Sequence, residues 1–182
     1  MRRCLSSVSL VLLLLLRHPA RAADEPPEYQ VKAVFIFNFS HFVEWPPQSL
    51  GAPTDPFVIG VLGSDPFGVR LDEVVRNERI EDHPLIVRRY RTANELSACQ
   101  ILFIDRSETA RLGTILAALD HRPVLTVAEI GGAAQDGAMI QFAMENNRIR
   151  LRINVESARS AGLMISSKLL RLADIVGTSS GD

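Results

Sequence analysis

An unbroken apolar run, Phe57 to Leu62, is the feature that most constrains the fold of this chain. A strand with one wet face alternates apolar and polar residues, whereas a strand covered on both faces reads as a continuous apolar run. Segments 100–105 and 123–127 are further predicted strands, and stretches with helical character separate them. Because strands that alternate with helices form a mostly parallel sheet, the sequence predicts a three-layer α/β/α domain.

The connections between these strands carry helix and turn signals. Asp65 and Pro66 suit the N-cap and the first position of a helix that ends near Arg76. Ser107 suits the N-cap of a second helix, which ends at Asp120. The remaining predicted elements are a strand over Pro84–Arg91, a short helical turn over Thr92–Ala98 capped by Thr92, and a loop at Gly131-Gly132.

The last third of the chain departs from this alternation. Residues 138–143 and 148–154 are predicted strands, and the segment Glu145-Asn146-Asn147 between them leaves no room for a crossover helix. Asn146-Asn147 suits a tight turn, so the sequence predicts a C-terminal antiparallel hairpin that adds edge strands to the sheet. Two further helices are expected, over Val155–Ala161 and Ser166–Val176, with Gly162 between them.

The first 22 residues have the three parts of a cleavable signal peptide. Arg2 and Arg3 give a basic start, Val8–Leu16 is an apolar run, and Ala20-Arg21-Ala22 is a small-x-small cleavage site. The apolar run is far shorter than the ~20 residues that a membrane-spanning helix needs, which disfavours an uncleaved anchor. The predicted organisation is a signal peptide over 1–22, a single domain over 23–176 and a disordered tail over 177–182.

Removal of this leader changes the charge of the chain. Residues 23–182 hold 16 basic and 21 acidic side chains, which gives a net charge of −5. A mildly acidic domain is a poor match for nucleic acid or for an anionic membrane surface.

Cys99 is the single cysteine of residues 23–182, so this part of the chain cannot form an internal disulfide. It precedes the apolar segment 101–104, and a buried structural thiol is the simplest interpretation, because free cysteine behaves as a small hydrophobe. The alternative is a redox role, either as a sensor or through an intermolecular bridge.

A helix predicted over Glu28–Glu44 holds a large share of the aromatic residues. Pro26-Pro27 precedes it and Pro46-Pro47 stops it. Apolar side chains lie on most of its sides, which indicates burial on most sides. It is either a central core helix or a helix that packs on its own domain with one face and on a partner protein with another. In the second case the candidate contact residues are Phe35, Phe39, Phe42 and Trp45.

The second strand of the predicted hairpin carries a basic strip. Arg148, Arg150 and Arg152 alternate with apolar residues, so one face of the strand is covered and the other is basic and solvated. This strip is a candidate surface for the acidic groups of a partner protein. The alternative is an edge strand whose charges discourage edge-to-edge pairing.

The loop after the first strand is a natural place for a small ligand, because ligands of such sheets bind at the carboxyl ends of strands. The sequence has no G-x-G-x-x-G motif and no P-loop lysine, and Asp65 would repel a phosphate, so a plain turn is the competing interpretation. The candidate ligand residues are Gly63, Ser64, Asp65 and Gly68, with Ser166, Ser167 and Lys168 as a second segment.

No arrangement of residues points to catalysis. There is no G-x-S-x-G elbow, and His41, His83 and His121 are isolated, without metal-ligand spacing. We therefore expect no catalytic residues, no metal and no cofactor, and a cryptic hydrolase is the least favoured function.

Six ordered blocks between Tyr29 and Val176 resemble the YfiR family of periplasmic proteins. Together they cover nearly all of the chain that follows the leader. The blocks are Val31–Phe39 with Phe42–Pro46, then Ile59–Gly68, Cys99–Ile104, Val124–Val127, Arg148–Asn154 and Ala161–Ala173.

The resemblance implies a bacterial periplasmic α/β domain that tends to dimerise and that acts as a repressor, not as an enzyme. The namesake of the family binds the periplasmic sensor region of a membrane-bound diguanylate cyclase and holds down cyclic-di-GMP synthesis. An outer-membrane lipoprotein can sequester the namesake and release the cyclase. The namesake also has internal disulfides, whereas the turn Glu145-Asn146-Asn147 lacks a cysteine here, so redox control of that kind does not carry over.

Two functions remain open. The first is a periplasmic regulator that binds a membrane signalling protein, which predicts an exposed apolar patch formed partly by the aromatic helix. The second is a periplasmic small-ligand sensor or carrier that uses Gly63–Gly68 and Ser166–Lys168. A fully enclosed helix beside a deep polar pocket at Asp65 would favour the second.

Overall fold

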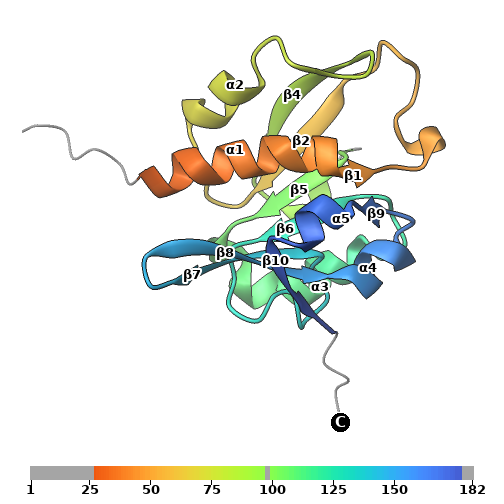
Figure 1. The fold of residues 1–182 in the computed structure, drawn as a ribbon. Coiled ribbons are helices and arrows are strands. Elements are labelled where there is room, and N and C mark those ends of the chain that lie inside the picture. The colour runs from red at the N-terminus through yellow and green to blue at the C-terminus, as the bar shows by residue number, and fades with distance from the viewer. Residues whose placement is uncertain (1–26, 97–98, 178–182) are drawn as a thin grey trace, which may run out of the picture.

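The computed structural model describes residues 27–96 and 99–177, so the predicted signal peptide lies outside the described residues, as does the tail beyond Gly177. An eight-stranded sheet has the order β10-β8-β7-β6-β5-β2-β4-β3 (Figure 1). Neighbouring strands are parallel except β7–β8 and β3–β4, which confirms the predicted mostly parallel sheet. The strands are β2 (Phe57–Leu62), β3 (Arg79–Ile80), β4 (His83–Tyr90), β5 (Ile101–Ile104), β6 (Leu125–Ala128), β7 (Ile140–Glu145), β8 (Arg148–Asn154) and β10 (Ala173–Val176).

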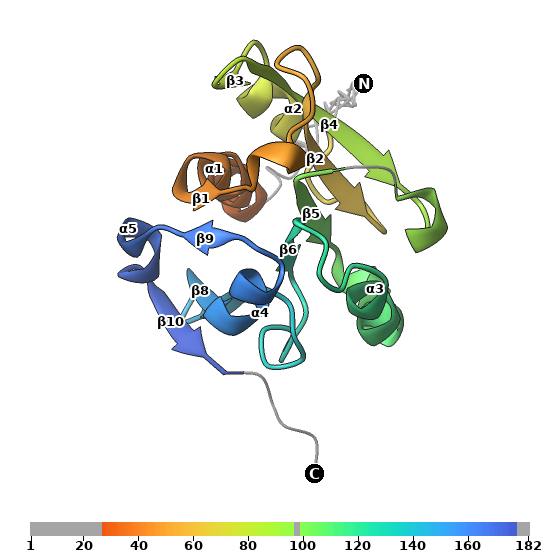
Figure 2. The same cartoon turned by 90° about the vertical axis from the view of Figure 1, so that its right-hand side faces the viewer.

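Helices cover both faces of this sheet, and Figure 2 shows α1 and α3 on opposite sides of it. The helices α1 (Pro27–Phe42), α2 (Val69–Val75), α4 (Val155–Ser160) and α5 (Ser167–Leu170) contribute to one core cluster, and α3 (Leu112–Ala118) contributes to the other. Because successive strand residues point to opposite faces, Val61 packs in the first cluster and Leu62 in the second. This explains the unbroken apolar run and confirms the three-layer α/β/α fold.

The aromatic helix α1 ends at Phe42, two residues before the predicted end. Val43–Glu44 instead forms a short strand, β1, which pairs antiparallel with β9 (Met164–Ile165). The partner strand lies about 120 residues later in the sequence, so the local sequence around Val43, which suits a helix, gives no sign of this pairing.

The C-terminal hairpin forms as predicted, from β7 and β8. Asn146 and Asn147 have φ values of 49° and 60°, and left-handed backbone at both central residues is what a type I′ turn requires. The hairpin does not form the edge of the sheet, because β10 pairs in parallel with the second half of β8, from Leu151 to Asn154. The first residues of β8, Arg148 to Arg150, lie outside the segment that pairs with β10.

The predicted helix over Ser166–Val176 is wrong in its second half. Helix α5 ends at Leu170, and Ala173–Val176 is the strand β10. The main-chain groups of these residues pair with β8, and this long-range pairing overrides the local helical pattern.

Of the three predicted caps, Asp65 and Ser107 do not occupy an N-cap position, whereas Thr92 does. Helix α2 begins at Val69 after Gly68, and Asp65 accepts hydrogen bonds from the amides of Phe67 and Gly68 in a turn that precedes the helix. Asp105 caps the 3₁₀ turn Arg106–Arg111 that leads into α3, and the amide of Ser107 donates to it over 2.8 Å. Thr92 precedes the 3₁₀ turn Ala93–Glu95, but its side chain makes no capping hydrogen bond.

Candidate functional site

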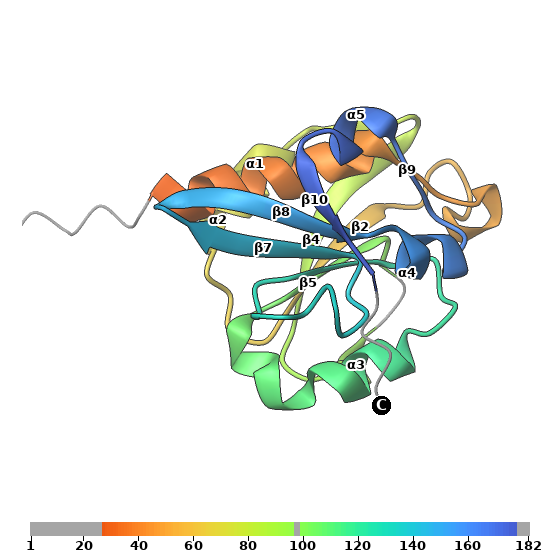
Figure 3. The ribbon, with the colours of Figure 1, turned by 60° about the horizontal axis from the view of Figure 1, so that its bottom comes forward.

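A groove lies between the exposed face of α1 and the tip of the β7–β8 hairpin, and we call it the α1–hairpin groove. Figure 3 shows the hairpin beside the N-terminal part of α1. The fold thus brings together Phe35 and Arg148, two predicted partner-contact residues from opposite ends of the domain sequence. The groove has a volume of about 390 Å³ and is lined by Glu28, Val31, Phe35, Met144, Asn147, Arg148 and Ile149.

Helix α1 has apolar side chains on two faces. Ile36 and Phe39 are fully buried in the core, whereas Val31 and Val34 on the outer face are 44% and 43% exposed. Phe35 is half-buried beside them, and residues three and four apart share a helix face, so these three side chains form one apolar strip. The regulator hypothesis expects exposed apolar side chains on the aromatic helix, and this strip is where α1 presents them.

The hairpin supplies the second wall of the groove. Met144 and Ile149 are directly opposite each other on β7 and β8, and both line the groove. Arg150 and Arg152 point to the other face of the hairpin, because side chains alternate along a strand. The apolar strip and the basic strip therefore meet only at the hairpin tip, where Arg148 borders the groove.

A buried ionic cluster holds the N-terminal part of α1 against the sheet. Lys32 is fully buried, its Nζ lies 3.1 Å from Oε2 of Glu129 just after β6, and it also contacts the carboxylate of Glu28. The Tyr29 hydroxyl donates to Oε1 of Glu129 over 3.1 Å, and the Arg106 guanidinium pairs with the same oxygen. Burial lowers the pKa of the Lys32 ammonium and raises the pKa of the Tyr29 phenol.

The sequence prediction missed this cluster. In the sequence, Lys32 is simply one of the few polar residues of the aromatic helix. The available signal is a lysine inside an apolar run with Glu28 four residues before it, a spacing that places the two side chains on one helix face. Glu129 lies far away in the sequence, so its part in the cluster becomes visible only in the fold.

A family model described as YfiR/HmsC-like matches residues 29–174. The chain belongs to the YfiR/HmsC-like family. The domains of this family are periplasmic and regulatory and are linked to cyclic-di-GMP signalling. No curated protein matches the chain.

The other predicted aromatic contact residues of this YfiR/HmsC-like domain lie at different depths. Phe39 is fully buried and stacks on Phe142 with ring centroids 6.0 Å apart, so in this conformation it belongs to the core and not to a surface. Phe42 and Trp45 are half-buried at the opposite end of α1 from the α1–hairpin groove. Of the four predicted aromatic residues, Phe35 alone lines that groove.

The candidate ligand loop Gly63–Gly68 folds as a closed turn. The Asp65 carboxylate pairs with the Arg89 guanidinium over 2.6 Å, and Arg89 also binds the Gly68 carbonyl over 2.7 Å. The Ser64 amide donates to Oγ of Ser107, and a Cβ on Gly63 would lie only 2.6 Å from the same atom. The polar groups of this loop therefore bind one another, and neighbouring side chains fill the space beside Gly63.

The second candidate ligand segment lies far from this loop. The Ser166 hydroxyl caps α5 by accepting from the Lys168 amide, and the Ser166 amide donates to the carbonyl of Phe42 at the end of α1. The loop Gly63–Gly68 contacts the start of α1 instead, through Phe67 and Tyr29. About 20 Å of helix separates Tyr29 from Phe42, so the fold does not join Ser166, Ser167 and Lys168 to the loop in one site.

Cys99, the candidate redox residue, is buried in the core cluster under α3. Burial raises the pKa of its thiol to about 11, so very little reactive thiolate is present at neutral pH. Its environment matches that of a structural thiol.

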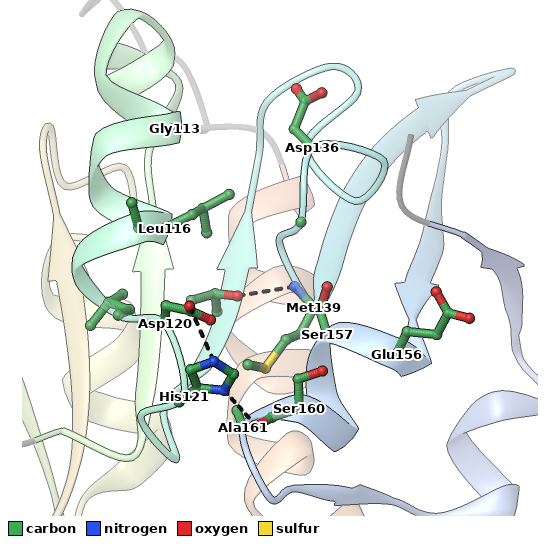
Figure 4. Close-up of a pocket in the computed structure, with 14 residues that line it drawn as sticks. Gly113, Leu116, Asp120, His121, Asp136, Met139, Glu156, Ser157, Ser160 and Ala161 are labelled. Atoms are coloured by element: carbon green, nitrogen blue, oxygen red, sulfur yellow. Dashed lines mark hydrogen bonds and ion pairs between the residues drawn. The ribbon is translucent and has the colours of Figure 1, made fainter. Parts of the chain in front are cut away.

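A polar pocket of about 450 Å³ lies between α3 and α4 (Figure 4). His121 stands at its lower rim, with Nε2 3.3 Å from the Asp120 carboxylate and Nδ1 3.3 Å from the Ser160 carbonyl. Both ring nitrogens thus face acceptor oxygens. Neither is hydrogen-bonded to a serine hydroxyl of the described chain, as the base of a nucleophilic serine would be.

Two further observations concern residues 27–96 and 99–177. Within these ranges no helix has the length and apolar character that a bilayer crossing demands. The same ranges contain no group of three or more histidine, cysteine or acidic side chains placed to hold a metal ion.

Proposed function

We propose that this YfiR/HmsC-like chain represses a membrane-bound diguanylate cyclase by binding the cyclase's periplasmic sensor region at the α1–hairpin groove. The observation that carries the proposal is the exposed apolar strip of Val31, Val34 and Phe35. Within it, Val31 and Phe35 line the groove together with the Met144–Ile149 pair. Membership of a family of regulatory domains in cyclic-di-GMP signalling supports the choice of partner.

The lining of the groove defines the chemistry of the contact. An apolar segment of the partner would cover the strip, and burying a side chain of valine or phenylalanine size stabilises a complex by ~1.5–3 kcal/mol. Arg148 and Arg150 are exposed, and neither forms an ion pair with another residue of the described chain. An acidic residue beside the apolar segment of the partner would pair with Arg148 at the hairpin tip.

The proposal includes the organisation of the chain. Residues 1–22 direct export to the periplasm and are removed, and residues 23–176 form the regulatory domain. The domain acts as a homodimer, and an outer-membrane lipoprotein that competes for it would release the cyclase. It acts without a cofactor.

Measurement of cyclic-di-GMP in cells tests this function. Deletion of the gene is expected to raise cyclic-di-GMP, and the wild-type gene is expected to restore the lower concentration. The variant Phe35→Asp places a charge in the apolar strip and is expected to fail to restore it. Val69→Asp is the matched control, because Val69 is an exposed apolar residue on α2, outside the groove.

Two results would contradict the proposal. One is an unchanged cyclic-di-GMP concentration after deletion in every growth condition. The other is full restoration by Phe35→Asp when immunoblotting shows that both variants accumulate to equal amounts in the periplasm.

A further inference from the structure

A second pocket lies at the C-terminal end of α1, apart from the α1–hairpin groove. Its volume is about 460 Å³, within the range of ~300–1,000 Å³ that small-molecule sites occupy. Its wall is apolar and aromatic, and two carboxylates stand among the lining residues. The side chains that carry the argument are Val43, Trp45, Phe57, Ile80, Glu44 and Glu81.

The Trp45 indole in this wall is held in one orientation. Its Nε1–H donates to the carbonyl of Gln100 over 3.2 Å, and its ring meets the Phe57 ring edge-on, with centroids 5.0 Å apart and planes at 87°. The indole is half-buried and lines the pocket. A fixed aromatic ring that lines a pocket is a ready binding surface for a cation, because the face of the ring carries negative charge.

The charges around the pocket have one sign. Glu44 and Glu81 are exposed, and neither forms an ion pair with any residue of the described chain. No lysine or arginine lines the pocket, and His41 is the remaining titratable residue in its lining. Both carboxylates stand on ordered backbone, since Glu44 pairs with Met164 in the β1–β9 sheet and Glu81 lies in the β3–β4 connection. The pocket therefore repels anions and lacks a counter-cation of its own.

We propose that this pocket binds a small organic ammonium ion that carries an apolar body. The ammonium group lies between the Trp45 indole and the carboxylates of Glu44 and Glu81, and the apolar body packs on Val43 and Ile80. The site is independent of the proposed repressor function, because it shares no lining residue with the α1–hairpin groove.

The fluorescence of Trp45 reports on this site directly, because Trp45 is the single tryptophan of the chain. The purified chain from residue 23 is titrated with choline and with phenethylammonium, and each is compared with its neutral counterpart, 3,3-dimethylbutanol or 2-phenylethanol. Saturable changes in Trp45 emission are expected for both cations, with at least tenfold weaker binding of the neutral compounds. No saturable change with either cation, or equal affinity for a cation and its neutral counterpart, would overturn the proposal.

Charge-removing variants locate the site. Glu44→Gln and Glu81→Gln are each expected to weaken cation binding about threefold to fivefold, because each removes one partly solvated carboxylate beside the bound charge. Glu156→Gln is the matched control, since Glu156 is an exposed acidic residue on α4 outside this pocket. This variant is expected to bind the cations with the affinity of the wild type. Unchanged affinity in both pocket variants, with thermal unfolding as in the wild type, would overturn the assignment.

Discussion

The Lys32 ammonium on α1 lies 3.1 Å from the Glu129 carboxylate after β6, and both side chains are almost completely buried. Lys32 also lies 5.8 Å from the centroid of the Phe142 ring on β7. This pair therefore fixes α1 relative to both the centre of the sheet and the hairpin. Val31 is adjacent to Lys32 on α1 and lines the α1–hairpin groove, so we expect the shape of the groove to depend on these contacts of Lys32.

Loss of the Glu129 carboxylate is expected to destabilise the fold strongly. Glu129→Leu leaves the Lys32 ammonium buried with Glu28 as its remaining carboxylate, and breaking one side of a buried ion pair costs about 3–5 kcal/mol. Urea unfolding of the chain from residue 23, followed by circular dichroism, measures this change in the free energy of unfolding.

The double variant Lys32→Met with Glu129→Leu is the control for that experiment. It removes both buried charges. Its free energy of unfolding is therefore expected to fall by clearly less than the summed losses of Lys32→Met and Glu129→Leu measured separately. Strictly additive losses would mean that Lys32 and Glu129 do not stabilise the fold through each other.

Cys99 is expected to react slowly in the folded protein. Burial raises the pKa of its thiol to about 11, from an ordinary value of 9.0, so its thiolate is about 100-fold scarcer than that of an exposed cysteine at pH 8. The rate of reaction with a disulfide reagent such as DTNB is expected to rise about tenfold per pH unit between pH 7 and pH 10. Rapid modification of the native protein at pH 7 would contradict the structural role of Cys99.

The same shift in the pKa of Cys99 predicts how stability depends on pH. The folded protein keeps its thiol proton to a higher pH than the unfolded chain does, so the folded state binds more protons between pH 9 and pH 11. The contribution of Cys99 to stability is therefore constant below pH 9 and falls as the pH rises above it. Comparison with Cys99→Ala, which has no thiol to titrate, isolates this dependence.

The hairpin turn is expected to tolerate glycine and to reject a branched residue. Asn146 has a φ of 49°, a left-handed conformation that costs a residue with a Cβ roughly 1–2 kcal/mol. Asn146→Val is expected to lower the free energy of unfolding by about 1 kcal/mol, whereas Asn146→Gly keeps or slightly raises it, as thermal unfolding can show. Equal stability of the two variants would mean that the turn has another conformation in solution.

Elements whose signals are local could be predicted from the sequence. The strand Phe57–Leu62 is apolar at every position because both of its faces are covered, and Asn146-Asn147 specifies its own turn. The strand Ala173–Val176 is not predicted, because the β8 residues with which it pairs lie about 20 residues earlier in the sequence. Asp65 does bind backbone amides as a cap would, but it binds them before the helix begins.

The candidate site could be predicted only in part. The aromatic helix and the basic strip are visible in the sequence, and Phe35 and Arg148 do meet at the groove. The sequence does not show that Phe39 faces the core, since apolar residues occupy both faces of α1. Nor does it show Met144, Val31 and Val34 as surface residues, because exposure depends on what the rest of the chain leaves uncovered.

Inhibition of a diguanylate cyclase in a reconstituted membrane tests the central claim most directly. The full-length cyclase, with its periplasmic sensor region, is placed in lipid vesicles together with the purified chain from residue 23, and the rate of cyclic-di-GMP synthesis is measured. The wild-type chain and Val69→Asp are expected to lower this rate alike, and Phe35→Asp is expected to inhibit at least tenfold more weakly. Equal inhibition by all three proteins, or none by the wild type, would contradict the claim that this domain represses the cyclase through the α1–hairpin groove.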